Sequence, residues 1–409
     1  MSRLSELIKE LCPTGVEYRK LGEIATITRG GSFQKKDFSE TGVPCIHYGQ
    51  IYTRYKLYAN FTYSFLSETI AQKQKKAKPN DIIMAVTSEN VEDVCKCVAW
   101  LGSEEVAVSG HAAIIHHAQN AKYLAYYFSS SLFYAQKKKL AHGIKVIEVT
   151  PDRLNDVIVP VPPIAVQNEI VRQLDEYVLA LTELGQLLTK EIALRKYQYE
   201  HYLDSMLLTL EQEVEEKTLN QIANIYDGTH QTPQYKDQGI PFISVENIDA
   251  IYSSRKYIST DAYSKFKIKP RPNDIFMTRI GSIGKCAVVD RSIDLAYYVS
   301  LALIRPDNSL INSKYLKYYI ESIHGKKELF KRTLHNAVPV KINKDDIGKI
   351  TIKFPTIAEQ NRIVEILDLL HDNCYQISDA LEEEIEKQTK RYEFYRDEIM
   401  SFKVKKHDN

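Results

Sequence analysis

The sequence predicts an α+β protein made of two similar globules, each followed by one long helix. Three observations support this prediction: a repeat along nearly the whole chain, short β-branched runs between turn residues in each globule, and coiled-coil-like apolar spacing after each globule. The expected limits are 1–160 for the first globule, 161–212 for the first helix, 213–353 for the second globule and 354–405 for the second helix.

The repeat is clearest where each helix is expected to begin. Val161-Pro-Pro-Ile-Ala-Val-Gln-Asn-Glu-Ile-Val171 recurs as Phe354-Pro-Thr-Ile-Ala-Glu-Gln-Asn-Arg-Ile-Val364, at an offset of 193 residues. This offset continues without a gap as far as Asp204 and Asp397. In the globules it drifts between about 191 and 198, so insertions and deletions are expected in the loops.

The two helices are predicted from apolar residues at steps of three and four. These residues run from Ile170 to Met206 and, at the same spacing, from Ile363 to Ile399. At 1.5 Å per residue, such helices would be about 60–65 Å long. An apolar stripe of this length needs a partner, and the other helix is the obvious one. The pattern leaves open whether the helices only join the globules or also bind other proteins.

The charge of the chain is segregated although its total is nearly zero. Lys and Arg number 54 against 53 Asp and Glu, yet Val106–Ile147 contains no acid at all. In the second globule, Ile251–Lys285 has eight basic residues against two acids, whereas Ile363–Glu386 has eight acids and no base. Neutralising phosphates requires local basic clusters and not a basic whole chain. The pattern therefore favours nucleic-acid binding by the globules over the alternative that each lysine run is only a solvated helix face.

Reading of bases requires polar side chains on loops between strands. Corresponding loops of the two globules differ in residue type, as expected if the globules read different short sequences. The candidate DNA-binding residues are Arg29, Ser32, Lys35, Lys36, His47, Gln50, Thr87, Ser88 and Lys145 in the first globule, and Thr229, His230, Gln231, Ser244, Glu246, Asn247, Arg279 and Ser282 in the second.

No catalytic or metal site is predicted. The chain has no Asp/Asn-Pro-Pro-Tyr/Phe methyltransferase motif, and Arg279–Cys286 lacks the spacing of a phosphate-binding loop. Cys95 and Cys97 alternate in an apolar run, which is more typical of a core than of zinc ligands. The six cysteines do not form a disulfide framework, and the charged opening segment does not look like a signal peptide, so a cytoplasmic protein is expected.

These features resemble the specificity (S) subunit of type I restriction-modification systems. The resemblance rests on the doubled plan, on Pro-x-Ile-Ala-x-Gln-Asn-x-Ile-Val at the start of each helix, on Asp227-Gly-Thr-His-Gln-Thr-Pro233 and on Gly239-Ile-Pro-Phe-Ile-Ser-Val-Glu-Asn-Ile248. It implies two α/β target recognition domains, each reading one half of a bipartite, asymmetric DNA sequence. It also implies that the two helices form an antiparallel coiled coil. Thr28–Phe33 departs from the pattern of Asp227–Thr232.

The resemblance further implies the partners of the chain. Two modification subunits would carry S-adenosylmethionine and methylate adenine N6, and two restriction subunits would use ATP and magnesium for translocation and cleavage. The chain itself would hold no cofactor and would not be an enzyme, and Gln167 and Gln360 would take part in subunit docking. Three alternatives stay open: the specificity subunit of a type IIB system, a nuclease or methyltransferase with an unrecognised site, and a coiled-coil scaffold that binds only proteins.

Overall fold

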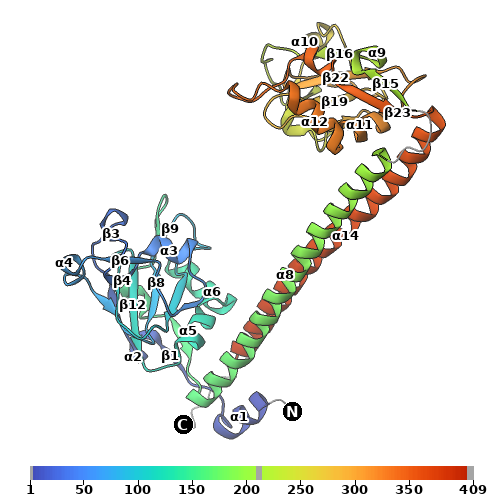
Figure 1. Ribbon diagram of the computed structural model, residues 1–409. Helices are drawn as coiled ribbons and strands as arrows, with labels where there is room; N and C mark the ends of the chain where they lie inside the picture. Colours follow the sequence, from blue (N-terminus) through green and yellow to red (C-terminus); the bar gives the residue numbers. More distant parts are fainter. Residues whose placement is uncertain (1–2, 209–213, 403–409) are drawn as a thin grey trace. The chain divides into compact units, whose positions relative to one another are not determined.

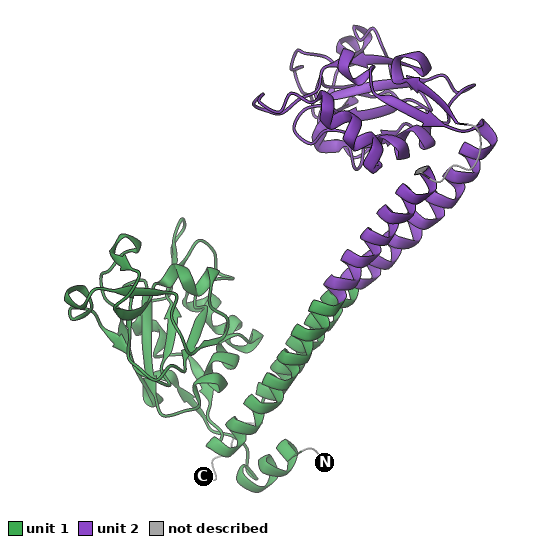
Figure 2. Cartoon of the chain, in the orientation of Figure 1, with its two compact units in different colours: residues 1–187, 383–409 green, residues 188–382 purple. Residues whose placement is uncertain are grey.

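A computed structural model describes residues 3–208 and 214–402. The chain forms two compact units, unit 1 from residues 1–187 with 383–409 and unit 2 from residues 188–382 (Figure 2). Helices α8 (Ile164–Leu208) and α14 (Ile357–Met400) are each shared between the two units (Figure 1). The expected division into two globules and two helices stays a prediction, and its limits at 212, 213 and 405 fall outside the described residues.

The main sheet of unit 1 has the strand order β2-β12-β8-β10-β5. Successive side chains of a strand point to opposite faces, and Ile82 and Met84 of β8 accordingly enter one core cluster while Ile83 and Ala85 enter another. Both faces of the sheet are thus covered. A second sheet has the order β3-β6-β4-β11-β7. The strands are β2 (Ala25–Arg29), β12 (Ala112–His117), β8 (Ile82–Ala85), β10 (Cys97–Trp100), β5 (Tyr58–Ala59), β3 (Phe38–Ser39), β6 (Ser64–Leu66), β4 (Val43–Ile46), β11 (Val106–Val108) and β7 (Lys76–Ala77).

Helices α5 (Ala121–Phe128) and α6 (Ser131–Leu140) cover one face of the main sheet, because Tyr123 and Phe133 lie in the same core cluster as Ile82. Each helix has a side-chain cap, from Asn120 in α5 and from Ser130 in α6. The remaining elements of unit 1 are α1 (Arg3–Leu11), β1 (Tyr18–Lys20), α2 (Leu21–Ile24), η1 (Lys35–Asp37), α3 (Tyr48–Thr53), α4 (Glu68–Ala71), β9 (Thr87–Ser88), β13 (Ile147–Glu148), α7 (Pro151–Leu154) and β14 (Ile158–Pro160).

Unit 2 repeats this topology with fewer strands. Its sheets have the orders β16-β22-β19-β20 and β18-β17-β21, and Ile275 and Phe276 of β19 point into different core clusters as Ile82 and Ile83 do. The elements are β15 (Glu215–Thr218), α9 (Leu219–Ile222), β16 (Ala223–Asp227), β17 (Ile240–Ile243), η2 (Val245–Asn247), β18 (Tyr257–Ile258), α10 (Thr260–Ser264), β19 (Ile275–Thr278), β20 (Cys286–Val288), β21 (Ala296–Tyr297), β22 (Leu301–Pro306), α11 (Ser313–Glu321), α12 (Ile323–Arg332), α13 (Lys344–Ile347) and β23 (Thr351–Phe354).

The long helices pack antiparallel within each unit, which confirms the expected pairing. In unit 1 the hydroxyl of Tyr395 donates to Gln173 at 2.7 Å, and one turn further along α8 the ring of Tyr177 lies 5.5 Å from that of Tyr392. In unit 2 the ring of Tyr199 lies 5.4 Å from that of His371. Further core contacts in unit 2 are made by Leu203, Leu207, Ile363 and Leu367.

Each globule is attached to its helix by the same hydrogen bonds. In unit 1 the carboxylate of Asp175 on α8 accepts from the hydroxyl of Tyr126 at 2.7 Å and pairs with Lys122. In unit 2, Asp368 on α14 accepts from Tyr318 at 2.5 Å and pairs with Lys314 at 2.6 Å (all at the corresponding repeat positions). The repeat therefore extends from sequence to individual side-chain contacts.

Candidate nucleic-acid interface

In unit 1 three of the expected reading loops meet at one edge of the main sheet. Strand β12 is antiparallel to both β2 and β8, so the end of β2 at Arg29 and the end of β8 lie together. The segment around Ser109 links the loops, because its hydroxyl accepts from the Tyr48 N–H at 2.8 Å and the neighbouring Val108 carbonyl accepts from the Gly31 N–H at 2.7 Å. The loops beginning at Arg29, His47 and Thr87 thus form one surface.

The exposed members of this surface are mostly cationic. Ser32, Lys35, Lys36 and Lys145 are exposed, and Ser88 is half-buried. The side chain of Arg29 is 46% exposed and pairs with Glu148. Lysine side chains of this kind contact phosphates, which position a protein on DNA without reading its sequence.

Three predicted base-reading residues of unit 1 have structural roles instead. His47 and Gln50 are buried, and Nδ1 of His47 accepts from the Gly49 N–H at 3.2 Å. The side-chain oxygen of Gln50 accepts from the His47 N–H, and its amide nitrogen donates to the Ser64 hydroxyl. Burial, followed by the charge of Lys35, lowers the pKa of His47, in keeping with a neutral ring that accepts. Thr87 is also buried. His47, Gln50 and Thr87 therefore expose little side-chain surface, and their contact with DNA stays a prediction.

In unit 2 the corresponding loops meet in the same way. The Thr229 N–H donates to the Tyr297 carbonyl at 3.1 Å, the Val245 N–H donates to the Ser300 hydroxyl at 3.1 Å, and the Arg279 N–H donates to the Ser300 carbonyl at 3.0 Å. The loops that begin at Asp227, Ser244 and Arg279 therefore share one edge. Their exposed or half-buried predicted residues are Thr229, His230, Gln231, Ser244, Glu246, Asn247 and Ser282.

Two of the predicted DNA-binding residues of unit 2 have hydrogen-bond partners within the fold. Arg279 is only 8% exposed, and its guanidinium pairs with Asp227 and donates to the Ile342 carbonyl at 3.2 Å, so it joins three segments of the fold. The side-chain oxygen of Asn247 accepts from the Ser244 N–H at 3.0 Å and caps η2, so that atom is already used. Arg279 therefore already has partners within the fold, and its contact with DNA stays a prediction.

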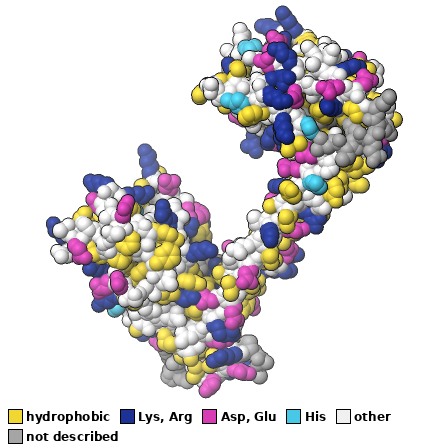
Figure 3. All heavy atoms as spheres, viewed as in Figure 1, with side chains coloured by type: hydrophobic (Ala, Val, Ile, Leu, Met, Phe, Trp, Pro, Cys, Tyr) yellow, Lys and Arg dark blue, Asp and Glu magenta, His cyan; other side chains and the backbone are white. Residues whose placement is uncertain are grey.

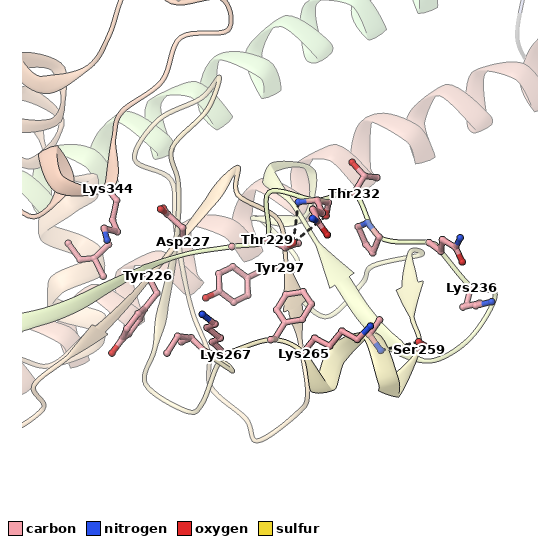
Figure 4. Close-up of a pocket in the computed structure, with 18 residues that line it drawn as sticks. Tyr226, Asp227, Thr229, Thr232, Lys236, Ser259, Lys265, Lys267, Tyr297 and Lys344 are labelled. Atoms are coloured by element: carbon pink, nitrogen blue, oxygen red, sulfur yellow. Dashed lines mark hydrogen bonds between the residues drawn. The ribbon is translucent and has the colours of Figure 1, made fainter.

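A cavity of about 710 Å³ lies beside the loop that follows Asp227 (Figure 4). Lys265 and Lys267 line it from the segment after α10, and Tyr226 and Tyr297 line it from the sheet. The prediction of site residues missed these groups, although the basic run that contains the two lysines was visible in the sequence. Cationic and aromatic side chains together are typical of surfaces that bind nucleic acid. Figure 3 shows Lys and Arg side chains gathered over the visible face of this unit.

Gln167 and Gln360, the predicted docking residues, form hydrogen bonds with their own globules. Both side chains are fully buried. Gln167 accepts from the Asn120 N–H at 2.9 Å and donates to the carbonyl of Pro162 at 2.8 Å and the side chain of Gln119 at 2.7 Å. The Gln360 side chain accepts from the Asn312 N–H and donates to the backbone carbonyls of Pro355 and Leu310. Each glutamine fixes the start of its long helix to its globule.

The described part of the chain contains no cluster of three or more His, Cys, Asp and Glu side chains suited to a metal ion. Cys95 and Cys97 are core residues, and burial raises the pKa of each thiol to about 12, which disfavours the thiolate that a metal or an electrophile requires. Within residues 3–208 and 214–402, no helix has the length and apolar character needed to cross a bilayer.

Two copies of one scaffold, each with its own set of polar and basic loops at one sheet edge, are the plan expected of a DNA sequence-recognition subunit. The chain belongs to the family described as the type I restriction modification DNA specificity domain, whose model matches it twice, over residues 13–194 and 211–387.

Curated relatives cover most of the chain. The specificity subunit of the type I restriction enzyme EcoR124I/EcoR124II of Escherichia coli is 28% identical over 427 aligned positions, which cover 98% of this chain and 98% of the relative. A putative type I specificity subunit of Haemophilus influenzae, S.HindORF215P, is 28% identical and covers 74% of this chain and 76% of its own length. The EcoBI specificity subunit of E. coli is 23% identical, over 89% of this chain and 80% of the relative.

Solved structures share the fold. One, from work on complex assembly and conformational transition of the type I R-M system, has a TM-score of 0.75 at 18% identity and covers 95% of this chain and 98% of the other. The HsdS subunit of Thermoanaerobacter tengcongensis has a TM-score of 0.59 at 18% identity and covers 95% and 97% of the two chains.

Proposed function

We propose that this chain is the specificity subunit of a type I restriction-modification complex and that each unit reads one half of a bipartite, asymmetric DNA site. The observation that carries the proposal is the contrast between scaffold and loops. The attachment residues Asp175 and Asp368 make the same contacts, whereas the loops after Arg29 and Asp227 differ in sequence. Two globules with the same scaffold and different loops suit two different half-sites.

Phosphate contacts and base contacts would come from different residues. Lys35 and Lys36 in unit 1, and Lys265 and Lys267 in unit 2, are exposed and would neutralise phosphates. His230, Gln231 and Glu246 in unit 2 are exposed polar groups able to reach base edges. This assignment leaves the buried residues His47, Gln50, Thr87 and Arg279 to hold the loops in shape.

The long helices would provide the docking surface for two modification subunits, and two restriction subunits would complete the complex. Both helices expose large apolar side chains that do not enter a core of their unit. They are Leu179, Leu187, Leu194 and Tyr197 on α8 and Leu369, Tyr375 and Phe394 on α14, all at least 50% exposed. Rows of exposed apolar groups mark surfaces that bind other proteins.

The chain would hold no cofactor of its own. S-adenosylmethionine would bind the modification subunits, which would methylate adenine N6, and ATP and magnesium would serve the restriction subunits. The complex would act on cellular DNA in the cytoplasm.

Sequencing that detects methylated adenines in host DNA, with and without this gene, tests the proposal. The expected result is a split motif with two defined halves that disappears when the gene is removed. A continuous motif, or no change in methylation, would contradict it. Methyl transfer or cleavage by the purified chain given S-adenosylmethionine, magnesium and DNA would favour an enzyme instead.

A further inference from the structure

Each unit carries a hairpin with a strongly exposed aliphatic tip at the same place in the repeat. In unit 1 the hairpin follows α6 and is closed by reciprocal bonds between His142 and Glu148, at 3.0 and 2.8 Å. In unit 2 it follows α12 and is closed by the bond from the Leu334 N–H to the Lys341 carbonyl at 2.8 Å. Figure 1 shows the latter as an orange loop that leaves the body of its unit.

The tips contribute almost nothing to either core. Ile144 is 97% exposed and Val146 60% exposed in unit 1, and Val338 is 99% exposed in unit 2. A single exposed aliphatic residue is common on protein surfaces. Exposure this complete, at the tips of two hairpins that occupy equivalent positions in the repeat, points to contact with something outside the chain.

Both hairpins adjoin the reading loops. In unit 1, β13 pairs with β9, so Ile147 lies opposite Ser88, and Glu148 pairs with Arg29. In unit 2, the Gly281 N–H donates to the Val340 carbonyl at 2.8 Å, beside the exposed Ser282. The tips therefore extend from the same edge that presents the polar loops.

The charge around the hairpins fits DNA. The hairpin of unit 1 contains Lys145 and one acid, Glu148, which pairs with Arg29, and Lys138 and Lys139 precede it on α6. Residues 333–344 contain Lys341 and Lys344 and no acid. An aliphatic tip between cations matches a groove of duplex DNA, where methyl groups meet sugars and base edges or enter a base step, and cations meet the phosphates on either side.

We propose that the hairpin tips, Ile144 with Val146 in unit 1 and Val338 in unit 2, insert into a DNA groove next to the bases read by the loops. The inference rests on the proposed function. It adds to the DNA-contacting surface residues whose side chains are neither charged nor able to form hydrogen bonds. Their contribution comes from burial of aliphatic surface and not from counterion release, so it should not depend on salt.

The test uses the complex assembled with its modification subunits and measures binding to DNA that carries the methylated motif. I144S/V146S and V338S should each weaken binding roughly tenfold or more, the factor expected when burial of an aliphatic side chain is lost, with the salt dependence unchanged. Leu101→Ser is the matched control. Leu101 is 38% exposed and follows β10, which is antiparallel to β8, so it lies at the opposite sheet edge and L101S should bind as the wild type does.

Each other outcome has a distinct meaning. Unchanged affinity of both hairpin variants would overturn this inference while leaving the proposed function intact. Loss of co-purification with the modification subunits would also overturn it, because the tips would then contact protein. Absence of sequence-specific binding by the wild-type complex would instead overturn the proposed function.

Discussion

Replacement of Gln167 by Ala separates a structural role from a docking role. The side chain is fully buried and makes three hydrogen bonds, to Asn120, Gln119 and Pro162. A hydrogen bond between neutral groups contributes about 1 kcal/mol, so Q167A should lower the free energy of unfolding of unit 1 by roughly 3 kcal/mol. A cavity and an unpaired buried N–H would add to this loss.

The assay is urea unfolding followed by tryptophan fluorescence. Trp100 is the only tryptophan of the chain and is buried in unit 1, so its emission reports on that unit. Q360A removes the corresponding three bonds in unit 2 and is the matched control. Q167A should shift the Trp100 transition to lower urea, whereas Q360A should mainly shift a transition seen by circular dichroism.

The reasoning would be refuted if Q167A unfolded at the wild-type urea concentration and yet failed to bind modification subunits. That outcome would support the subunit-docking role of Gln167 that the family resemblance implies. Normal subunit binding by a destabilised Q167A would support the structural role.

Three further predictions concern DNA binding and pH. K35A/K36A should weaken binding to every DNA sequence and reduce the slope of log affinity against log salt by up to ~2 in titrations, because each phosphate contact contributes ~0.9. H230A should instead change the base preference at one half of the motif in methylation profiling, and an equal loss at all sequences would contradict this. Burial lowers the pKa of His117 from 6.5 to about 4, so the unfolded chain binds the proton more readily. The free energy of unfolding of unit 1 should therefore fall between pH 6.5 and pH 4, by up to about 3 kcal/mol, and H117Q should lessen that fall in urea titrations.

The architecture was predictable because it depends on periodic signals. The repeat at Val161 and Phe354 and the apolar spacing after it predicted two long helices, which begin at Ile164 and Ile357. Such patterns are visible in sequence because apolar residues recur along one face of each helix. The antiparallel direction, in contrast, was implied by the resemblance, because the same apolar spacing suits parallel and antiparallel pairs.

The reading residues were less predictable, because a polar side chain on a loop can face the solvent or the chain itself. His47 and Gln50 form a capping box around α3, and Arg279 joins Asp227 to the backbone of Ile342. Sequence alone gives these residues the same appearance as base-reading residues. Which of them is free depends on contacts with segments distant in the chain, such as the bond from Gln50 to Ser64.

The hairpin tips were missed for the opposite reason. All three tip residues, Ile144, Val146 and Val338, are β-branched, and Val146 and Val338 adjoin other apolar residues, a pattern that indicates a short core strand. In the structure they lie at tips whose flanking residues pair with reading loops, and their side chains point away from the core. An apolar residue is therefore a poor indicator of burial in a hairpin this short.

The two capping boxes show how such a fold can change its specificity without losing stability. His47 and Gln50 occupy the same repeat positions as Ser244 and Asn247, and each pair caps the turn that follows its strand. The cap requires only an acceptor at each position, so several residue types satisfy it. The attachment residues Asp175 and Asp368, in contrast, make bonds that depend on a carboxylate meeting a tyrosine and a lysine. Substitution in the loops therefore costs the fold little, whereas substitution at Asp175 or Asp368 would release a globule from its helix. The chain can vary its recognition surface because the loop residues and the attachment residues are separate.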